Sequence, residues 1–374
     1  MRVVVAPDKF AGSISAPAAA AAFERGWRSV RPDDDVLKVP LSDGGPGFLD
    51  CLSESLGGVV RTVDVAGPWG DPVSATVLAT ADTWYVEAAK ANGHDLPGVP
   101  DPLTGSSVGV GEIVAAAIAA GAVTVVVGLG GSATNDGGAG LLGALGARAW
   151  DARDDLVDLA GGPAVIGQIS RIDLAEARRR LARVRVLVAT DVDNPLLGNA
   201  GATAVFGPQK GLGEEERVVA EESLTNLVRA CVAAGVAPGT DRLAGAGAAG
   251  GLGYGLLALG GTRTSGAAFV AAAVGLERAC RSADLVVTGE GSFDAQSLRG
   301  KVVIGVREAA GDAPAVVVAG RNRLTDLEWR RAGFSGVVAL EDRVSTAEQS
   351  MARATELMEL AAADLASSVS GSDP

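Results

Sequence analysis

The amino-acid sequence predicts an α/β fold built on parallel sheets, and three observations support this prediction. Apolar runs rich in valine recur without the polar alternation of a half-exposed strand, at residues 3–6, 123–128, 185–190, 284–289 and 315–320. Strands buried on both faces of a parallel sheet have this pattern. Segments with a helical pattern lie between the runs, at residues 17–29, 106–120, 214–234 and 346–367. The 52 glycines follow no collagen-like period and suit close packing with short turns.

The elements follow in order along the chain. A strand at 3–6 leads to a helix at 17–29, which Ser15 is placed to cap and Pro17 to open. A further strand is expected at 36–39. Residues 74–89 alternate and contain the turn-like sequence Ala-Asp-Thr, so they predict an antiparallel hairpin. This change of pattern indicates a second domain that begins near residue 70, and 374 residues are enough for two domains.

One segment, residues 113–131, carries no charged side chain. Gly121 divides it into a helical half rich in alanine and a β-branched half. We therefore predict a buried helix, a turn and a strand rather than a membrane span.

Charge and cysteine content exclude several classes of partner. The net charge is -13 and the isoelectric point is near 4.7, which argues against nucleic acid or an anionic membrane. Cys51, Cys231 and Cys280 are odd in number and widely spaced, so we expect no disulfide framework and a reducing, cytoplasmic location. The first residues lack the long apolar region of a signal peptide. His94 is the only histidine, which excludes a multi-histidine metal site.

Polar residues gather directly after the apolar runs. Residues 7–13, 40–47, 129–138, 190–198 and 288–301 share glycine, aspartate, serine or threonine, and an occasional lysine. Open α/β sheets bind ligands beyond the carboxyl ends of their strands, so together these segments predict a site for a polar ligand. Taken singly, each segment is more typical of a tight turn.

The stretch VVVGLGGSATNDGGAG, residues 125–140, is typical of a phosphate site. A strand that leads through glycines into a helix can direct several backbone N–H groups at one anion. The alternative is structural, with Asn135 and Asp136 capping the helix. No Lys-Ser/Thr pair follows the glycines, so this is not a Walker motif. Residues 245–251 match G-x-G-x-x-G without a preceding strand, so we interpret them as a glycine-rich loop that opens a helix, with a nicotinamide-dependent oxidoreductase as a distant alternative.

Charged side chains next to these glycines suggest cation and phosphate chemistry. Asp191 and Asp193 follow a predicted strand, where they could hold Mg²⁺ with waters and phosphate oxygens. One of them could instead deprotonate a hydroxyl, and the structural alternative is an Asx-turn around Asn194. Lys210 and Lys301 are isolated cations that either offset phosphate charge or lie on the surface. These parts suit phosphoryl transfer, which depends on positioning and charge neutralisation, but they leave the acceptor open.

Several long motifs of this chain resemble those of a known protein family. They are APDKFAGSISA at residue 6, DGGPG at 43, GLGGSATNDGGAG at 128, DVDNPLLG at 191, GATAVFGPQKG at 201, GAGAAGGLG at 245 and ADLVVTGEGSFDAQSLRGK at 283. In this order and over nearly the whole chain, the sequence resembles the bacterial glycerate kinase family, which includes enzymes of glyoxylate and glucarate breakdown.

The resemblance implies phosphorylation of D-glycerate by ATP with Mg²⁺, usually at the 2-hydroxyl. It implies two α/β domains that face each other across a cleft. One is flavodoxin-like with a parallel sheet and comprises residues 1–70 plus 285–374, and the other comprises residues 71–284. The catalytic candidates are Asp191, as base or metal ligand with Asp193, then Asp43, and Lys301. The substrate and phosphate candidates are Asp8, Lys9, Ser13, Ser132, Thr134, Asn135, Asn194, Lys210, Glu290, Asp294 and Gln296.

Three departures from the family pattern concern charge. Family members usually read FKGS, DGGEG and GEGRID where this chain has Ala11, Pro46 and Ser292. A lysine, a glutamate and an arginine are thus replaced by neutral residues. Lys9 and Arg299 are candidates to supply the missing positive charge.

Three functions remain open from the sequence. The first is a glycerate kinase, the second a paralogue that phosphorylates another small hydroxy acid, and the third a catalytically weakened ligand-binding or regulatory protein. The expected partner is a small molecule, and the oligomeric state is open between monomer and homodimer.

Overall fold

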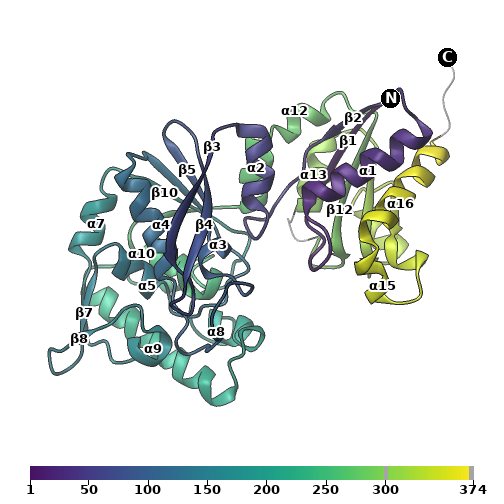
Figure 1. The fold of residues 1–374 in the computed structure, drawn as a ribbon. Helices are drawn as coiled ribbons and strands as arrows, with labels where there is room; N and C mark the ends of the chain where they lie inside the picture. Colours follow the sequence, from purple (N-terminus) through teal and green to yellow (C-terminus); the bar gives the residue numbers. More distant parts are fainter. Residues whose placement is uncertain (299–301, 370–374) are drawn as a thin grey trace. The chain divides into compact units, whose positions relative to one another are not determined.

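The computed structural model describes residues 1–298 and 302–369 of the chain. Internal contacts divide the chain into two compact units (Figure 1). Unit 1 comprises Met1–Asp43, Asp50–Leu56 and Ala267–Pro374, and unit 2 comprises Gly44–Leu49 and Gly57–Gly266.

Unit 1 is built on a five-stranded parallel sheet. Its strands are β1 (Arg2–Pro7), β2 (Asp35–Lys38), β12 (Leu285–Phe293), β13 (Ala315–Asn322) and β14 (Gly336–Ala339). The spatial order is β14-β13-β12-β1-β2, and every neighbouring pair is parallel. Counted along the chain within this unit, the order is the 2-1-3-4-5 of flavodoxin-like folds. The predicted fold class is therefore confirmed, and both ends of the chain contribute strands.

Helices cover both faces of this sheet. α1 (Ala16–Val30) and α16 (Ala354–Ser368) pack side by side against one face (Figure 1), over Val3 and Val5. Val4 is fully buried as well and points to the opposite face, because side chains alternate along a strand. α12 (Leu276–Cys280) and α13 (Val302–Ala310) contact the strands there. The remaining helices of unit 1 are α11 (Gly266–Ala273), α14 (Asp326–Arg331) and α15 (Ala347–Ala352).

Two helix predictions in unit 1 can be compared with the structure in detail. Ser15 caps α1 as expected, because its Oγ accepts from the N–H of Ala18 at 3.4 Å. The prediction of one helix over 346–367 is wrong, since the segment breaks into α15 and α16 at Arg353. The backbone of Arg353 departs from helical geometry at φ -108° and ψ 17°. The side chain of Arg353 forms an ion pair with Glu356 in the first turn of α16.

Unit 2 contains a six-stranded mixed sheet. Its strands are β3 (Val59–Ala66), β4 (Pro72–Ala79), β5 (Thr83–Glu87), β6 (Thr124–Gly128), β10 (Arg185–Ala189) and β11 (Thr262–Thr264), in the order β11-β10-β6-β5-β4-β3. The first four strands in this order are parallel, whereas β4 is antiparallel to both β5 and β3. β4 and β5 form the predicted hairpin, which is confirmed.

The helices of unit 2 and a small second sheet complete its core. The helices are α2 (Phe48–Leu56), which crosses the division between the units, α3 (Ala89–Asn92), α4 (Val108–Ala119), α5 (Ala139–Ala144), α6 (Gly162–Ile166), α7 (Ala175–Leu181), α8 (Ala202–Phe206), α9 (Glu214–Ala233) and α10 (Leu252–Ala258). The second sheet has the order β8 (Leu156–Val157), β7 (Arg148–Trp150), β9 (Arg171–Asp173), all antiparallel. The uncharged segment forms α4 and β6 around Gly121 (φ +85°), as predicted. No helix in the described part of the chain is long and apolar enough to span a bilayer.

The compact units begin and end at other residues than the predicted domains. β3 pairs with β4 in the sheet of unit 2, although residues 57–70 were expected in the first domain. Residues 267–284 pack within unit 1, although they were expected in the second domain.

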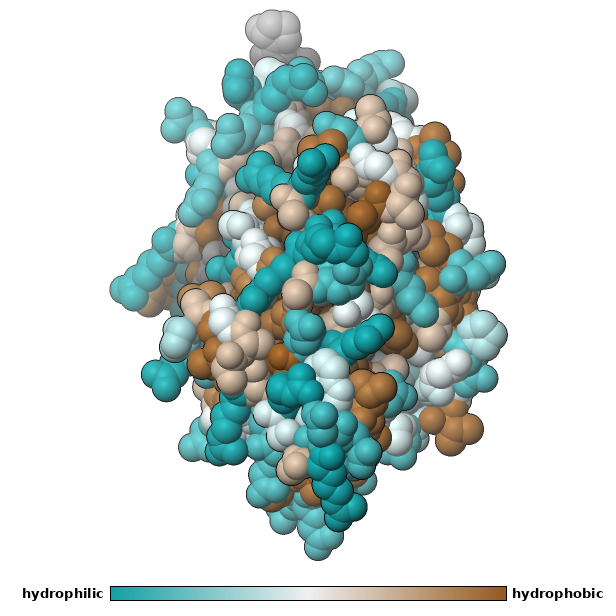
Figure 2. Space-filling view, turned by 90° about the vertical axis from the view of Figure 1, so that its left-hand side faces the viewer, coloured by the Kyte–Doolittle hydropathy of each residue, from teal (hydrophilic) through white to brown (hydrophobic). Residues whose placement is uncertain are grey.

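Apolar and hydrophilic side chains are interspersed over the face of the molecule drawn in Figure 2, with no single continuous apolar area.

Candidate active site

A polar pocket lies at the carboxyl ends of the central strands of unit 1. We call it the switch-point pocket, because β1 and β12 are the neighbours at which the strand order reverses, where open α/β sheets bind ligands. It has a volume of about 520 Å³. Its lining includes Asp8, Lys9, Asp43, Glu290, Ser292, Asp294, Arg321 and Glu341.

Backbone pairing brings Asp8 and Lys9 to this pocket. The N–H of Asp8 donates to the carbonyl of Gly289 on β12 at 2.8 Å, which continues the ladder beyond the end of β1. The Oδ1 of Asp8 accepts from the N–H of Lys9 at 2.7 Å. The Nζ of Lys9 is 3.1 Å from the Oδ1 of Asp43, which follows β2. Neighbouring parallel strands therefore place an ion pair and a second carboxylate together.

Asp8 titrates far from its usual range. Burial raises the pKa of this carboxyl from 3.8 to about 7, and the negative charges of Asp43 and Glu290 add to the rise, while Lys9 opposes it. A carboxyl with a pKa near neutrality can exchange a proton readily at cellular pH. Such groups are enriched in active sites, so Asp8 is the strongest candidate for proton transfer in unit 1.

The polar segment after β12 forms a local network at the edge of the pocket. The Oγ of Ser292 donates to the Oδ2 of Asp294 at 3.4 Å, and the Oδ1 of Asp294 accepts from the N–H of Gln296 at 2.8 Å. Gln296 is exposed and is not part of the pocket lining. Ser13 lines the pocket, with its hydroxyl donating to the carbonyl of Phe10 at 2.9 Å. Lys301 lies outside the described residues.

The glycine-rich stretch of unit 2 is shaped by close packing. An added Cβ at Gly130 would lie 2.7 Å from the Cα of Gly45, and at Gly138 it would lie 2.9 Å from the Cα of Gly255. At Gly250, within the second glycine motif, it would lie 1.9 Å from the carbonyl oxygen of Thr134. The glycines thus let three chain segments approach at backbone contact.

Asp136 takes the structural role that was one alternative for this stretch. Its buried carboxylate accepts from the N–H groups of Gly138 and Gly140 at 3.0 Å each, where α5 begins. It also accepts from the N–H and the hydroxyl of Ser107, both at 2.8 Å. Burial raises the pKa of this carboxyl, and these hydrogen bonds act in the opposite direction. The amides at the start of α5 are therefore bound by the protein itself.

The other predicted phosphate ligands of unit 2 are buried beside this stretch. The Nζ of Lys210 donates to the carbonyl of Thr134 at 2.6 Å and to the Oγ of Ser132 at 3.1 Å. Burial lowers the pKa of this ammonium to about 7. The Nδ2 of Asn135 donates to Thr203 at 3.0 Å. In this structure Lys210 therefore holds the glycine-rich stretch in place through two hydrogen bonds. Phosphate binding by Lys210 and its neighbours stays a prediction.

Asp191, Asp193 and Asn194 each bond to other parts of unit 2. The Oδ1 of Asp191 accepts from the hydroxyl of Ser265 at 2.6 Å and from the N–H of Gly266 at 3.0 Å. Asp193 forms an ion pair with Arg263. The Nδ2 of Asn194 donates to the carbonyl of Ala200 at 2.8 Å.

The Asp191–Asp193 pair does not fit a preformed Mg²⁺ site. Protein donors hold both carboxylates, and the Arg263 cation lies beside one of them. Across residues 1–298 and 302–369, no group of three or more His, Cys, Asp or Glu side chains is arranged to hold a metal ion. Metal binding by this pair stays a prediction.

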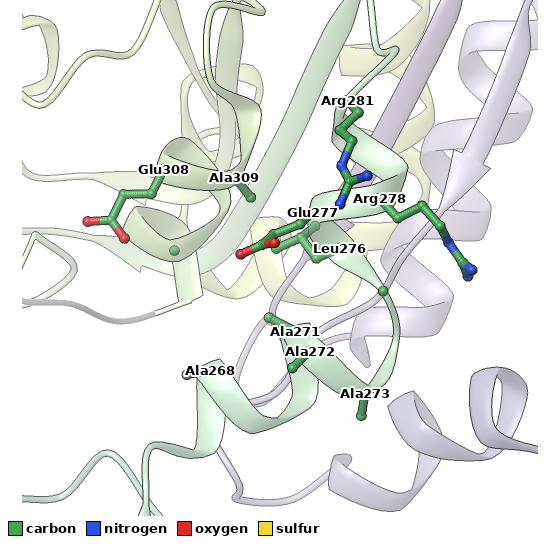
Figure 3. Close-up of a pocket in the computed structure, with 12 residues that line it drawn as sticks. Ala268, Ala271, Ala272, Ala273, Leu276, Glu277, Arg278, Arg281, Glu308 and Ala309 are labelled. Carbon is green, nitrogen blue, oxygen red and sulfur yellow. The ribbon is translucent and has the colours of Figure 1, made fainter.

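A larger cavity of about 860 Å³ lies among α11, α12 and α13 of unit 1 (Figure 3). Alanines form much of its lining, and the side chains of Glu308 and Arg278 extend in opposite directions. Its polar groups do not converge on one point. The switch-point pocket is therefore the better candidate site of unit 1.

Among the charged residues that line the described part of the switch-point pocket, sequence reasoning missed Arg321 and Glu341. Arg321 directly follows the apolar run at 315–320, so the rule that selected the other strand ends would have found it. Glu341 follows β14, a four-residue strand that was not predicted. Glu87 was also missed; it is buried at the end of β5 and accepts from the N–H groups of Gly47 and Leu49, where α2 begins.

The parallel sheets and the charged pocket at the switch point define the chain as an α/β enzyme that handles a small polar molecule. Residues 3–370 match the sequence model of the Glycerate kinase family. The chain belongs to that family, as its motifs predicted, and its class of activity is that of a kinase-like phosphotransferase.

Individual relatives agree with this assignment. The chain is 39% identical over 377 residues to a protein of Bacillus subtilis (strain 168) named glycerate kinase, covering 99% of this chain and 98% of the relative. It is 39% identical over 333 residues to the glycerate 2-kinase of Escherichia coli (strain K12), covering 87% of this chain and 86% of the relative. A crystal structure assigned as a glycerate kinase 2 from Salmonella typhimurium LT2 is similar with a TM-score of 0.80 and 36% identity, over 99% of this chain and 98% of that one.

Proposed function

We propose that this protein transfers the γ-phosphoryl group of ATP to the 2-hydroxyl of D-glycerate, giving 2-phosphoglycerate and ADP. Membership of the glycerate kinase family supports the phosphotransferase class and the acceptor. The name of the E. coli relative, glycerate 2-kinase, supports the position of transfer. The proposed mechanism depends on one observation, which is the raised pKa of the Asp8 carboxyl. A pKa of about 7 suits a general base.

Bond making and bond breaking balance in the proposed step. The acceptor oxygen attacks the γ-phosphorus while the bond from that phosphorus to the β–γ bridging oxygen breaks, and ADP leaves. The hydroxyl proton passes to the carboxylate of Asp8 and then to solvent. Burial, together with the negative charges of Asp43 and Glu290, keeps the pKa of Asp8 high enough for it to accept the proton, and Lys9 opposes this rise. The reaction depends mainly on positioning and charge stabilisation.

The cofactors of this proposal are ATP and Mg²⁺. Mg²⁺ bound to the phosphates would neutralise charge as the phosphoryl group moves. Because the Asp191 and Asp193 carboxylates are held by Ser265, Gly266 and Arg263, they do not fit this ion, and we assign no side chain of this protein to it.

The test is ADP release from Mg-ATP with D-glycerate and with a panel of other small hydroxy acids. Turnover with D-glycerate supports the proposal. Turnover only with another hydroxy acid supports the paralogue, which the neutral Ala11 and Ser292 keep open. Nucleotide binding without any turnover supports a regulatory protein.

The same assay separates the two candidate bases. Asp8→Ala should lower turnover by roughly 10²–10⁴-fold if Asp8 is the base, whereas Asp191→Ala should do so if the sequence-based choice of base is right. An Asp8→Ala variant with near-normal turnover would rule out proton transfer to Asp8.

A further inference from the structure

Arg321 is a cation in the switch-point pocket that the proposed mechanism does not use. It lies near the end of β13, where it is in register with Ser292 of β12. Its Nε donates to the Oγ of Ser292 at 3.1 Å, and that Oγ in turn donates to Asp294 at 3.4 Å. A hydroxyl that is itself oriented by a carboxylate therefore holds one side of the guanidinium.

Lys9 and Arg321, the two cations among the described residues that line the pocket, differ in what they bind. Lys9 forms an ion pair with Asp43 at 3.1 Å. In the described part of the chain, the side chain of Arg321 bonds to the neutral hydroxyl of Ser292 and forms no ion pair with a carboxylate. Its positive charge is therefore not neutralised locally, although Asp8, Glu290 and other acids line the same pocket.

The remaining donors of Arg321 suit a planar anion. A guanidinium has five N–H groups in a fixed fork, and the bond to Ser292 uses the one on Nε. The two Nη atoms still offer a pair of parallel N–H groups, which matches the two oxygens of a carboxylate. A small hydroxy acid carries its own carboxylate, which the acidic side chains of this pocket would repel. Binding such an acid near Asp8 therefore needs a cation that no protein acid neutralises.

We propose that Arg321 binds the carboxylate of the hydroxy acid acceptor and that Ser292 is a positioning residue for its guanidinium. The inference rests on the proposed function, because it concerns the acceptor of the same reaction. It also accounts for the neutral residues at positions 11 and 292, since β13 supplies a positive charge beside Ser292. A nucleotide phosphate is a second source of an anion with similar chemistry, so the experiment must separate the two.

The kinetic test compares Arg321→Ala with the wild type and with Arg330→Ala. Arg330 is the matched control, because it is exposed, pairs with Asp326 at 3.7 Å, and lies outside the pocket lining together with that partner. We expect Arg321→Ala to raise KM for D-glycerate 10- to 100-fold and to change KM for ATP less than threefold. Arg321→Lys should recover part of the loss, and Ser292→Ala should raise KM for D-glycerate about threefold to fivefold. A rise in KM for ATP alone would overturn the proposal and indicate phosphate binding.

A binding test keeps this inference separate from the proposed function. Titration calorimetry without nucleotide would measure the binding of D-glycerate, of other hydroxy acids and of glycerol, which lacks the carboxylate. We expect the wild type to bind at least one hydroxy acid more tightly than glycerol, and Arg321→Ala to lose that preference. If the wild type shows no turnover yet has this preference, the kinase proposal fails while the role of Arg321 stands. Equal preference in both proteins, or no binding of any hydroxy acid by the wild type, would overturn the role of Arg321.

Discussion

The Asp8 carboxyl gives the sharpest prediction for catalysis, and Asp8→Asn is the perturbation that tests it. The asparagine amide is nearly isosteric but cannot accept the hydroxyl proton of the acceptor. Removing a general base typically lowers the rate by roughly 10²–10⁴-fold. We therefore expect kcat of Asp8→Asn to fall by about that factor, with a smaller change in KM for either substrate.

The pH dependence of the wild type follows from the raised pKa. With a pKa of about 7, only about one-tenth of Asp8 is ionised at pH 6 and about nine-tenths at pH 8. Activity should therefore rise about tenfold over this interval. Asp43→Asn removes the larger of the two neighbouring negative charges that raise the pKa of Asp8 and also removes the ion-pair partner of Lys9, so the midpoint should move to lower pH.

The assay is steady-state turnover at saturating substrates from pH 5.5 to 9, compared among wild type, Asp8→Asn and Asp43→Asn. Terminal phosphates also titrate near pH 6, so the diagnostic quantity is the part of the profile that Asp8→Asn removes. Asp312→Asn, an exposed acid outside the pocket lining, is the matched control and should resemble the wild type.

Stability provides an independent readout of the same carboxyl. The folded protein holds a proton on Asp8 that the unfolded chain releases near pH 4, so the free energy of unfolding should fall as pH rises from about 4 to about 7. Asp8→Asn should remove this part of the pH dependence. An unchanged pH–rate profile together with an unchanged pH–stability profile in Asp8→Asn would refute the reasoning.

Three further predictions concern stability and can be measured by urea denaturation. Asp136→Ala removes the acceptor of four buried donors, and each donor costs about 1–3 kcal/mol when unsatisfied. The free energy of unfolding should therefore fall by at least roughly 4 kcal/mol, and a loss below about 1 kcal/mol would contradict the capping role. Burial raises the pKa of Asp34, but hydrogen bonds from the amino terminus, Arg31 and Trp27 outweigh it and lower the pKa to about 2. Its contribution of about 2 kcal/mol is therefore present above pH 4 and lost as pH falls through 2, and Asp34→Asn should cost about that much at pH 7 but little at pH 2. Gly250→Ala should lower the free energy of unfolding far more than Gly260→Ala. Both glycines have a positive φ, but only at Gly250 would the added Cβ lie against a carbonyl oxygen. Equal losses in the two variants would show that the cost comes from backbone strain alone.

Strands that are buried on both faces were predictable because their sequence pattern is local. β1, β6, β10, β12 and β13 each appear as an apolar run, and the structure places each of them between two parallel neighbours. β3 was missed because it is an edge strand with exposed valines, 58% at Val59 and 62% at Val60. Such a strand depends on its pairing with β4, which no local pattern reveals.

The site was harder to predict because its residues depend on distant partners. The polar segments after β1 and β12 were two of the five that the sequence predicted to form one site, and these two lie together because β1 and β12 are parallel neighbours. The glycines of residues 128–140 were interpreted as a phosphate site. In the structure this stretch packs closely against the backbone at Gly45 and Gly250, which lie far away in the sequence. The partners of Asp191 are likewise more than 70 residues away.

Identification of the product formed from D-glycerate and Mg-ATP would decide whether this protein phosphorylates glycerate at the 2-hydroxyl. ³¹P and ¹³C nuclear magnetic resonance of the reaction mixture would show which oxygen carries the new phosphoryl group. Our account predicts 2-phosphoglycerate in an amount equal to the ADP released, and almost none with Asp8→Asn. Phosphorylation at another hydroxyl, or ADP release without any phosphoglycerate, would contradict it.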